Sequence, residues 1–218
     1  MNIPDKVLKK RLQNVYFIWG RGKTTVADLL RAQYHCAVYS TDDSRDPHRE
    51  EADPADEPYM CRDFEAEYGV TFWELPKEVI AKREAHWLSE MTPMIIADLL
   101  VLAGQHDCIL CEGDIDYDAA AKAATHMVYL WNRASHFDWF DRPDHADALD
   151  SIRNRTDIGE DEKAHLIEQA YQAVAVNEEC LPDWVTRLGI PVIAWDDTTT
   201  PEQTARDAAA LFGLDSVG

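Results

Sequence analysis

Five short apolar runs, rich in Val, Ile, Tyr and Trp, recur along the chain between longer stretches of helical periodicity. They are Asn14–Trp19, Cys36–Ser40, Cys108–Cys111, His126–Trp131 and Pro191–Trp195. Apolar runs of this length are typical of strands that are buried on both faces, and their alternation with helices is typical of a parallel sheet. The pattern therefore predicts an α/β protein.

Several of the stretches between these runs have the apolar spacing of amphipathic helices. Apolar residues recur every three or four positions over Thr24–Tyr34 and over Ile80–Leu102. Pro93 interrupts the second stretch, and we expect a new helix to begin there, capped by Thr92. A last helix is predicted from Thr200-Pro201-Glu202-Gln203, because this sequence combines an N-cap residue, a proline in the first turn and a capping-box glutamine.

The length of 218 residues favours a single domain over residues 1–218. The segment between the second and third apolar runs is much longer than an ordinary connection, so we expect a substrate-side insertion over about residues 44–90. Two further helices are expected, one beginning near Ala134 and one through Ala164–Val174. A polar, charge-dense segment from Arg142 to Glu162 precedes the second of them.

Acidic residues outnumber basic ones, with 41 Asp and Glu against 21 Lys and Arg and a formal net charge of -20. A field of this sign repels polyanions, so we expect no general binding to nucleic acid or to anionic membranes. Many of the acids crowd residues 42–57, and we interpret most of that run as a solvated loop.

The cysteines indicate a reducing compartment. Their number, 5, is odd, they are widely scattered, and the chain is large enough to fold without disulfide cross-links. The first residues lack the apolar core of a signal peptide, and the longest apolar stretch, Met94–Ala103, is interrupted by Asp98 and too short to span a bilayer. We therefore expect a cytoplasmic protein. Cys108 and Cys111 have zinc-like spacing, but residues three apart on a strand point to opposite faces and cannot share a metal ion.

The clearest chemical signal is Gly20-Arg21-Gly22-Lys23-Thr24-Thr25, which follows the first predicted strand and precedes the first predicted helix. Glycines let the backbone approach phosphate oxygens, and a helix N-terminus directs N–H groups at them. A lysine then neutralises phosphate charge and a hydroxyl binds Mg²⁺. These six residues are therefore candidates for nucleotide binding, with Thr24 as the metal ligand.

This loop is three residues shorter than the pattern G-x-x-x-x-G-K-[ST], because only Arg21 separates Gly20 from Gly22. Two explanations stay open. The loop is contracted, and could then have lost phosphate binding, or three loop residues are missing from the sequence. A glycine-rich turn with an incidental lysine is the alternative to a phosphate site.

Acidic residues follow two other predicted strands, where ligands of parallel α/β sheets bind. Asp42 and Asp43 come after the second strand, and Glu112 comes at the end of the third. A carboxylate here can accept the proton of an attacking hydroxyl or hold a metal-bound water. Asp42 is a candidate for either role, and Asp43 and Glu112 are candidate substrate contacts, with Glu112 placed to organise Mg²⁺ instead. The alternatives are that the aspartates begin the acidic loop and that Glu112 is structural.

Together these motifs resemble the small-molecule P-loop kinases, in particular the group of shikimate kinase, gluconate kinase and chloramphenicol phosphotransferase. The resemblance covers most of the chain, from about residue 14 to 214, through roughly a dozen motif residues. It implies a three-layer α/β/α fold with a five-stranded parallel sheet in the order 2-3-1-4-5, and a lid over about residues 142–162. It also implies that Lys23 and Thr24 bind nucleotide phosphate and Mg²⁺, that Asp42 acts on the substrate hydroxyl, and that Arg153 and Arg155 belong to the lid.

The expected function is an ATP-dependent, Mg²⁺-requiring kinase that acts on a hydroxyl of a small molecule, one that is nucleoside-like or antibiotic-like. Planar arginines suit the charge of a transferring phosphoryl group, although Arg153 and Arg155 could instead pair with neighbouring aspartates. The expected partners are a nucleotide and a small-molecule acceptor. Two other functions remain open: a nucleotide-binding regulatory module without turnover, and a P-loop NTP hydrolase.

Overall fold

The computed structural model of the chain describes residues 3–70, 74–75, 77–133, 149–174 and 181–214. It divides into two compact units. Unit 1 comprises Met1–Cys61, Ala85–Ala134 and Glu178–Gly218, and unit 2 comprises Arg62–Glu84 and Ser135–Asn177. The boundaries of the expected insertion and lid stay predictions.

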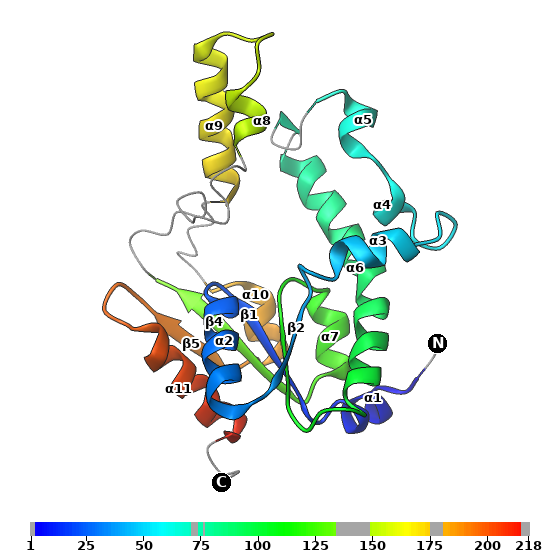
Figure 1. Ribbon diagram of the computed structural model, residues 1–218, viewed down its shortest axis with the longest axis vertical. Coiled ribbons are helices and arrows are strands. Elements are labelled where there is room, and N and C mark those ends of the chain that lie inside the picture. Colours follow the sequence, from blue (N-terminus) through cyan, green and yellow to red (C-terminus); the bar gives the residue numbers. More distant parts are fainter. Residues whose placement is uncertain (1–2, 71–73, 76, 134–148, 175–180, 215–218) are drawn as a thin grey trace. The chain divides into compact units, whose positions relative to one another are not determined.

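Unit 1 contains a five-stranded parallel sheet, as the sequence predicts (Figure 1). Its strands are β1 (Val15–Gly20), β2 (Ala37–Ser40), β3 (Ile109–Glu112), β4 (His126–Asn132) and β5 (Val192–Trp195). The order across the sheet is β2-β3-β1-β4-β5, which confirms the order implied by the resemblance. Every strand begins and ends within one residue of its predicted bounds.

Helices cover both faces of this sheet. Those in unit 1 are α1 (Asp5–Arg11), α2 (Lys23–Tyr34), α3 (Arg45–Glu51), α4 (Pro58–Cys61), α7 (Tyr117–Ala123), α10 (Asp183–Leu188) and α11 (Pro201–Phe212). The long helix α6 (Lys77–Leu102) begins in unit 2 and continues in unit 1. Unit 2 also contains α5 (Phe64–Tyr68), α8 (Asp150–Arg153) and α9 (Glu160–Val174). The helices predicted over Thr24–Tyr34 and Ala164–Val174 and after Thr200 are thus confirmed, whereas the helix expected near Ala134 lies outside the described residues.

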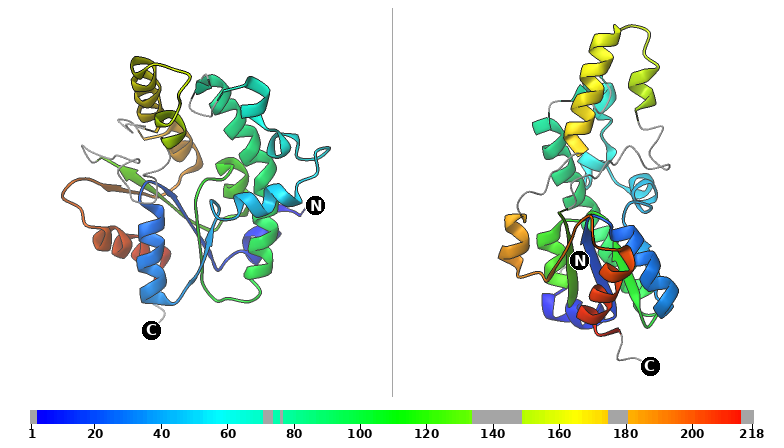
Figure 2. Two further views of the ribbon diagram at one scale, coloured as in Figure 1. Left: turned by 45° about the horizontal axis from the view of Figure 1, so that its top comes forward. Right: turned by 90° about the vertical axis from the view of Figure 1, so that its left-hand side faces the viewer.

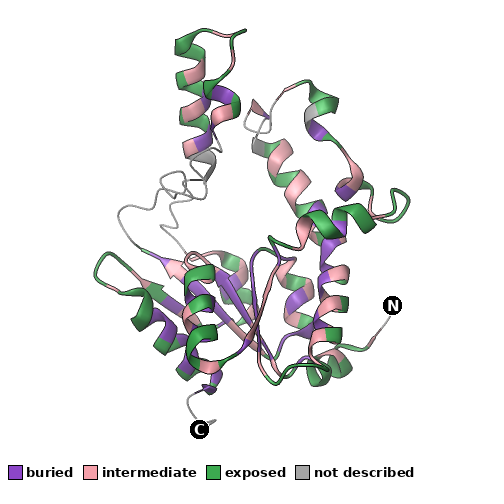
Figure 3. Ribbon diagram, viewed as in Figure 1, coloured by how far each residue is buried: buried purple, intermediate pink, exposed green. Residues whose placement is uncertain are grey.

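Two apolar clusters pack against the sheet, one on each face. Figure 3 shows buried residues along the strands and within the helices that cover them. Alternate residues of β1 enter different clusters: Phe17 packs with α1, α6, α7 and α10, and Ile18 packs with α2 and α11. Cys108 and Cys111 also pack in different clusters. The expectation that these two cysteines face opposite sides of the sheet is therefore confirmed.

Helix α6 continues through Pro93, so the prediction of a new helix at that residue is wrong. The Thr92 hydroxyl donates to the Leu88 carbonyl oxygen at 2.6 Å and accepts from the Asp116 N–H at 3.0 Å, rather than capping a helix. Met91 and Ile95, on either side of the proline, are both fully buried. Tertiary packing therefore outweighs the helix-breaking tendency of proline.

One helix in the described part of the chain, Glu78–Leu102 of α6, is long and apolar enough to cross a membrane by length and composition alone. The core helix of a folded domain passes the same test, and α6 buries Met91, Ile95 and Leu99 against the sheet.

The last helix, α11, begins as predicted. The Thr200 hydroxyl accepts a hydrogen bond from the Gln203 N–H, and Pro201 occupies the first turn. The Gln203 amide does not complete the capping box, because it binds Asp207 and Arg206.

In unit 2, α8 and α9 are neighbours (Figure 2) and share a small apolar cluster. Its buried members are Leu149, Ile152, Leu166 and Ala170. The Arg155 guanidinium binds the carboxylate of Glu74, which ties the two sequence segments of this unit together.

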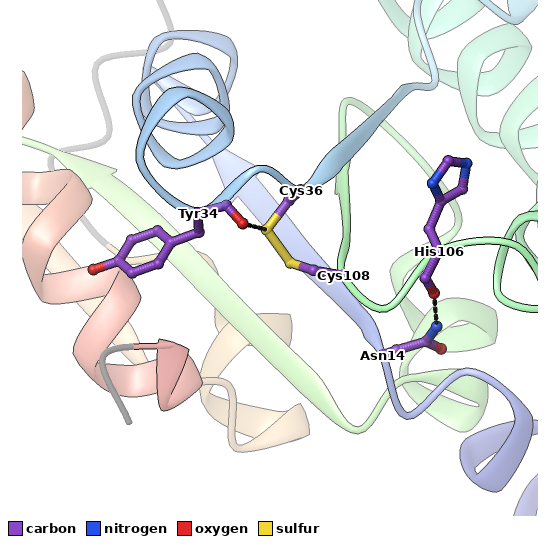
Figure 4. The surroundings of a disulfide bond; sticks show 5 residues. All are labelled: Asn14, Tyr34, Cys36, His106 and Cys108. Atoms are coloured by element: carbon purple, nitrogen blue, oxygen red, sulfur yellow. Dashed lines mark hydrogen bonds between the residues drawn. A yellow bond between two sulfur atoms is a disulfide. The ribbon is translucent and has the colours of Figure 1, made fainter. Parts of the chain in front are cut away.

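A disulfide joins Cys36, just before β2, to Cys108, just before β3 (Figure 4). The odd number and wide scatter of the cysteines gave no sign of this pairing. It forms because Cys36 and Cys108 immediately precede Ala37 and Ile109, which are partners across the two parallel strands. Cys61 and Cys111 are free thiols. Cytoplasmic localisation stays a prediction.

Candidate phosphate-binding site

The candidate phosphate loop is a very tight connection. Strand β1 ends at Gly20 and helix α2 begins at Lys23, so Arg21 and Gly22 alone link them. Both glycines have positive φ, 90° and 83°. A Cβ atom at Gly20 would lie 2.2 Å from the Leu130 carbonyl oxygen in β4. Glycine at position 20 is therefore required by both backbone conformation and space.

Neighbouring strands brace this short loop. The Arg21 N–H donates to the Leu130 carbonyl oxygen at 3.1 Å, and the Trp195 indole N–H donates to the Arg21 carbonyl oxygen at 3.1 Å. The Trp195 ring also lies 3.7 Å from the position that a Cβ atom of Gly22 would occupy. The loop is therefore held against β4 and β5, and it has fewer N–H groups to offer than a loop with three more residues.

The first two residues of α2 contact acidic residues that follow or end two other strands. Lys23 Nζ lies 3.5 Å from Asp42 Oδ2, with 20% of the lysine and 49% of the aspartate side chain exposed. Thr24 Oγ1 donates to Glu112 Oε2 at 2.9 Å. The structure therefore brings together Lys23, Thr24, Asp42 and Glu112, as the sequence suggested.

Glu112 is the most unusual member of this group, because it is a buried carboxylate with 2% of its surface exposed. Within the described residues, the Thr24 hydroxyl is the donor that reaches its side chain. Next to it, Gly113 has φ 118° and packs against Thr41, whose hydroxyl donates to the Asp114 carbonyl oxygen at 2.9 Å. A buried carboxylate with one neutral donor is costly unless a cation or further donors neutralise it.

The other two candidates in unit 1 have weaker environments. Asp43 is exposed, and its N–H donates to the Ser40 hydroxyl at 3.3 Å, which is part of a turn. Thr25 is exposed in the first turn of α2. Their roles stay predictions.

A divalent cation would find oxygen ligands in the Thr24 hydroxyl and in the carboxylates of Glu112 and Asp42. Among the described residues, no group of three or more His, Cys, Asp or Glu is placed to hold a metal ion by itself. Mg²⁺ usually takes one or two carboxylates, water and substrate phosphates rather than a complete protein cage. The residues present therefore fit Mg²⁺ bound together with a phosphate.

The two arginines that the resemblance places in a lid, Arg153 and Arg155, lie in unit 2 and are paired with acids there. Arg153 Nη1 lies 3.2 Å from Asp150 Oδ1, and the Arg155 guanidinium binds the carboxylates of both Asp157 and Glu74. The Arg155 guanidinium lowers the pKa of Asp157 to about 2 through its hydrogen bonds. The pairing of these arginines with neighbouring acids, one of the sequence-based alternatives, is thus present.

Sequence reasoning missed a polar network beside the site. Asp98 on α6 accepts hydrogen bonds from Tyr39 on β2 and His48 on α3. A signal was available, since Asp98 is the charged residue that interrupts the apolar stretch Met94–Ala103. Its partners could not be read from the sequence.

The turn after β5 also organises a carboxylate. Asp196 accepts hydrogen bonds from the backbone and hydroxyl of Thr198 and from the hydroxyl of Thr199, and the Thr198 hydroxyl is the largest cause of its lowered pKa. All of these hydrogen bonds join residues of the turn itself.

No family model matches the chain, and no curated protein matches it. Among solved structures, it is similar to the dephospho-CoA kinase from Campylobacter jejuni, with 11% identity over 92% of this chain and 96% of that one, and a TM-score of 0.43. A likeness at this level assigns neither a family nor an activity. The resemblance to the shikimate and gluconate kinase group is not confirmed.

Proposed function

We propose that this protein is a kinase that transfers a phosphoryl group from Mg-ATP to a hydroxyl of a small molecule. The observation that carries the proposal is the meeting of Lys23 with Asp42 and of Thr24 with Glu112. These residues come from the ends of β1, β2 and β3, and ligands of open α/β sheets bind beyond the carboxyl ends of the strands. A lysine, a hydroxyl and two carboxylates at that edge suit phosphate, Mg²⁺ and an acceptor hydroxyl.

Each residue has a distinct role in this proposal. The Lys23 ammonium and the first N–H groups of α2 stabilise negative charge on the phosphates, because those N–H groups have no acceptor within the helix. Thr24 and Glu112 would hold Mg²⁺, which would supply positive charge to stabilise the phosphates. Asp42 orients the acceptor hydroxyl and receives its proton. Little covalent assistance is needed, because phosphoryl transfer depends chiefly on positioning and electrostatics.

Arg153 and Arg155 are proposed as lid residues that bind the transferred phosphoryl group. Arg155 would have to exchange its carboxylate partners, Glu74 and Asp157, for phosphate oxygens. A guanidinium suits both kinds of partner, since carboxylate and phosphate present similar oxygen geometry. The acceptor is proposed to be nucleoside-like or antibiotic-like. The cytoplasm is the proposed location, and neither nucleic acid nor membrane is a proposed partner.

Binding can be tested by thermal unfolding with and without Mg-ATP. A ligand at about 100 times its Kd adds roughly 2.7 kcal/mol of stability, which raises the Tm of a chain this size by about 5–10 °C. We expect this rise for the wild type and for Lys10→Ala, a matched exposed lysine on α1, and its loss in Lys23→Ala. No rise in the wild type would refute the proposed site.

Transfer is then tested with labelled Mg-ATP and hydroxyl compounds such as adenosine, ribose and chloramphenicol. Label on an acceptor, lost in Asp42→Ala, is the expected result. Phosphate release that no hydroxyl compound changes would instead indicate an NTP hydrolase.

A second candidate, a nucleotide-binding module without turnover, is favoured by the two-residue loop and its bracing by Trp195. Insertion of Gly-Ser-Ala between Gly20 and Arg21 restores the G-x-x-x-x-G-K-T spacing and distinguishes the two candidates. A module that lost its loop should bind nucleotide without transfer as wild type and gain transfer on insertion. A kinase adapted to the short loop should transfer as wild type and lose activity on insertion.

A further inference from the structure

Three side chains from three elements of unit 1 meet at one carboxylate oxygen. Tyr39 Oη in β2 donates to Asp98 Oδ2 at 2.8 Å, and His48 Nε2 in α3 lies 2.9 Å from the same oxygen. Because an ionised carboxylate can only accept, His48 carries its proton on Nε2. Asp98 belongs to α6, so one oxygen atom joins the edge strand of the sheet to α3 and α6.

The burial of this network is unusual for a purely stabilising contact. His48 is 4% exposed, and its Nδ1 atom has no hydrogen-bond partner among the described residues. A buried polar atom without a partner costs free energy, and natural structures contain few of them. The carboxylate it holds is 47% exposed. A buried histidine with an unpaired nitrogen thus binds a carboxylate that is about half exposed.

The two donors flank Asp42 along the chain, since Tyr39 precedes it and His48 follows it. Between them the backbone forms consecutive turns, in which Ser44 N–H donates to Ser40 O at 3.3 Å and His48 N–H donates to Ser44 O at 3.0 Å. The segment that carries Asp42 is thus anchored at both ends to a single atom of α6.

We propose that Asp98 is a positioning residue for Asp42. By accepting hydrogen bonds from Tyr39 and His48, it fixes the ends of the segment between them and so keeps Asp42 beside Lys23. The inference rests on the proposed function, in which Asp42 orients the attacking oxygen. Small displacements of such a group are expensive, because a shift of about 1 Å can lower a rate about 100-fold.

The test compares substitutions at Asp98 with one at a matched carboxylate. Asp98→Ala removes both hydrogen bonds, Asp98→Asn keeps an oxygen acceptor, and Tyr39→Phe removes one donor with little change of shape. The control is Glu90→Ala on the same helix, because Glu90 Oε2 accepts from the Met60 N–H at 2.9 Å, and Met60 lies outside the segment from Tyr39 to His48. The readouts are phosphate release from Mg-ATP with water as acceptor, and hydrogen exchange of the backbone N–H groups within residues 40–48.

We expect Asp98→Ala to lower kcat about 10- to 100-fold with an unchanged KM for ATP, and to speed exchange over residues 40–48. Asp98→Asn should restore most of the kcat and most of the protection from exchange. Tyr39→Phe should have a kcat and an exchange rate between those of the wild type and Asp98→Ala, and Glu90→Ala should match the wild type in both. Wild-type kcat in Asp98→Ala, or an equal loss in Glu90→Ala, would overturn the proposal. If the wild type releases no phosphate to water, which leaves transfer to a small-molecule acceptor untouched, exchange alone decides: faster exchange in Asp98→Ala and Tyr39→Phe supports positioning, and unchanged exchange overturns it.

Discussion

Substitution of Cys108 by Ala removes the one disulfide among the described residues. The disulfide to Cys36 closes a loop of 72 residues in sequence separation, which contains β2, α3, α4, α5 and α6. Without the link, the unfolded chain gains the conformational freedom of that loop, while the sheet loses no backbone pairing. Cys108 is the better position to change, since Cys36 is more deeply buried.

The magnitude follows from the sequence separation. The chain-entropy relation for a cross-link gives about 4.4 kcal/mol at 25 °C for the printed separation of 72. For a chain of this size, each kcal/mol shifts Tm by about 2–4 °C, so Cys108→Ala should lower Tm by roughly 9–18 °C.

The assay is thermal unfolding, monitored by circular dichroism, with and without a thiol reductant. Reductant should lower the Tm of the wild type to nearly that of Cys108→Ala and leave the variant unchanged. Cys61→Ala is the control, because Cys61 is a free thiol and should keep the reductant response. Cys111 should not exchange into the disulfide, since burial raises the pKa of its thiol and keeps it protonated. Equal Tm values for oxidised and reduced wild type, with the Cys36–Cys108 linkage verified by peptide mapping, would refute the reasoning.

Two further predictions concern single residues. Gly113→Ala should lower the free energy of unfolding by about 1–3 kcal/mol in denaturant titrations, because φ is 118° and the new Cβ would lie 2.0 Å from Thr41 Oγ1. Gly159→Ala, where nothing lies within 4 Å, should have little effect, and equal losses in both variants would contradict the argument. Arg155→Ala should raise the pKa of Asp157 from about 2 towards 3.8, measured by carboxyl NMR titration. Because the folded pKa is depressed, the stabilisation from this pair is present above about pH 4 and is lost as the pH falls towards 2; an unchanged pKa in the variant would show that Arg155 is not the cause.

Much of the fold could be predicted because its signals are local. The strands of unit 1 are short apolar runs, and β1 shows why they are recognisable, since alternate residues such as Phe17 and Ile18 must both be apolar to enter clusters on opposite faces. The start of α11 was equally readable, because the N-cap bond joins residues three apart. The prediction of a new helix at Pro93 was wrong, because buried residues on both sides of the proline keep α6 continuous.

In the candidate site, too, the local features could be predicted and the long-range contacts could not. Its loop glycines and Lys23 are adjacent in sequence, so a motif could identify them. The network of Tyr39, His48 and Asp98 was not predicted, although Asp98 stood out in its apolar stretch. Nothing within a few residues of Asp98 indicates that two donors will converge on it.

The sequence by itself determined the alternation of strands and helices, the position of the short glycine loop and the acids that follow the strands. Each of these depends on interactions within one or two turns of chain, which periodicity and residue type express directly. Tertiary structure alone decided that Thr24 would donate to Glu112 across 88 positions and that Cys36 would bond Cys108 across 72. Such contacts depend on which strands become neighbours, and that choice is made when the whole core packs, because many weak contacts from distant segments are then satisfied together.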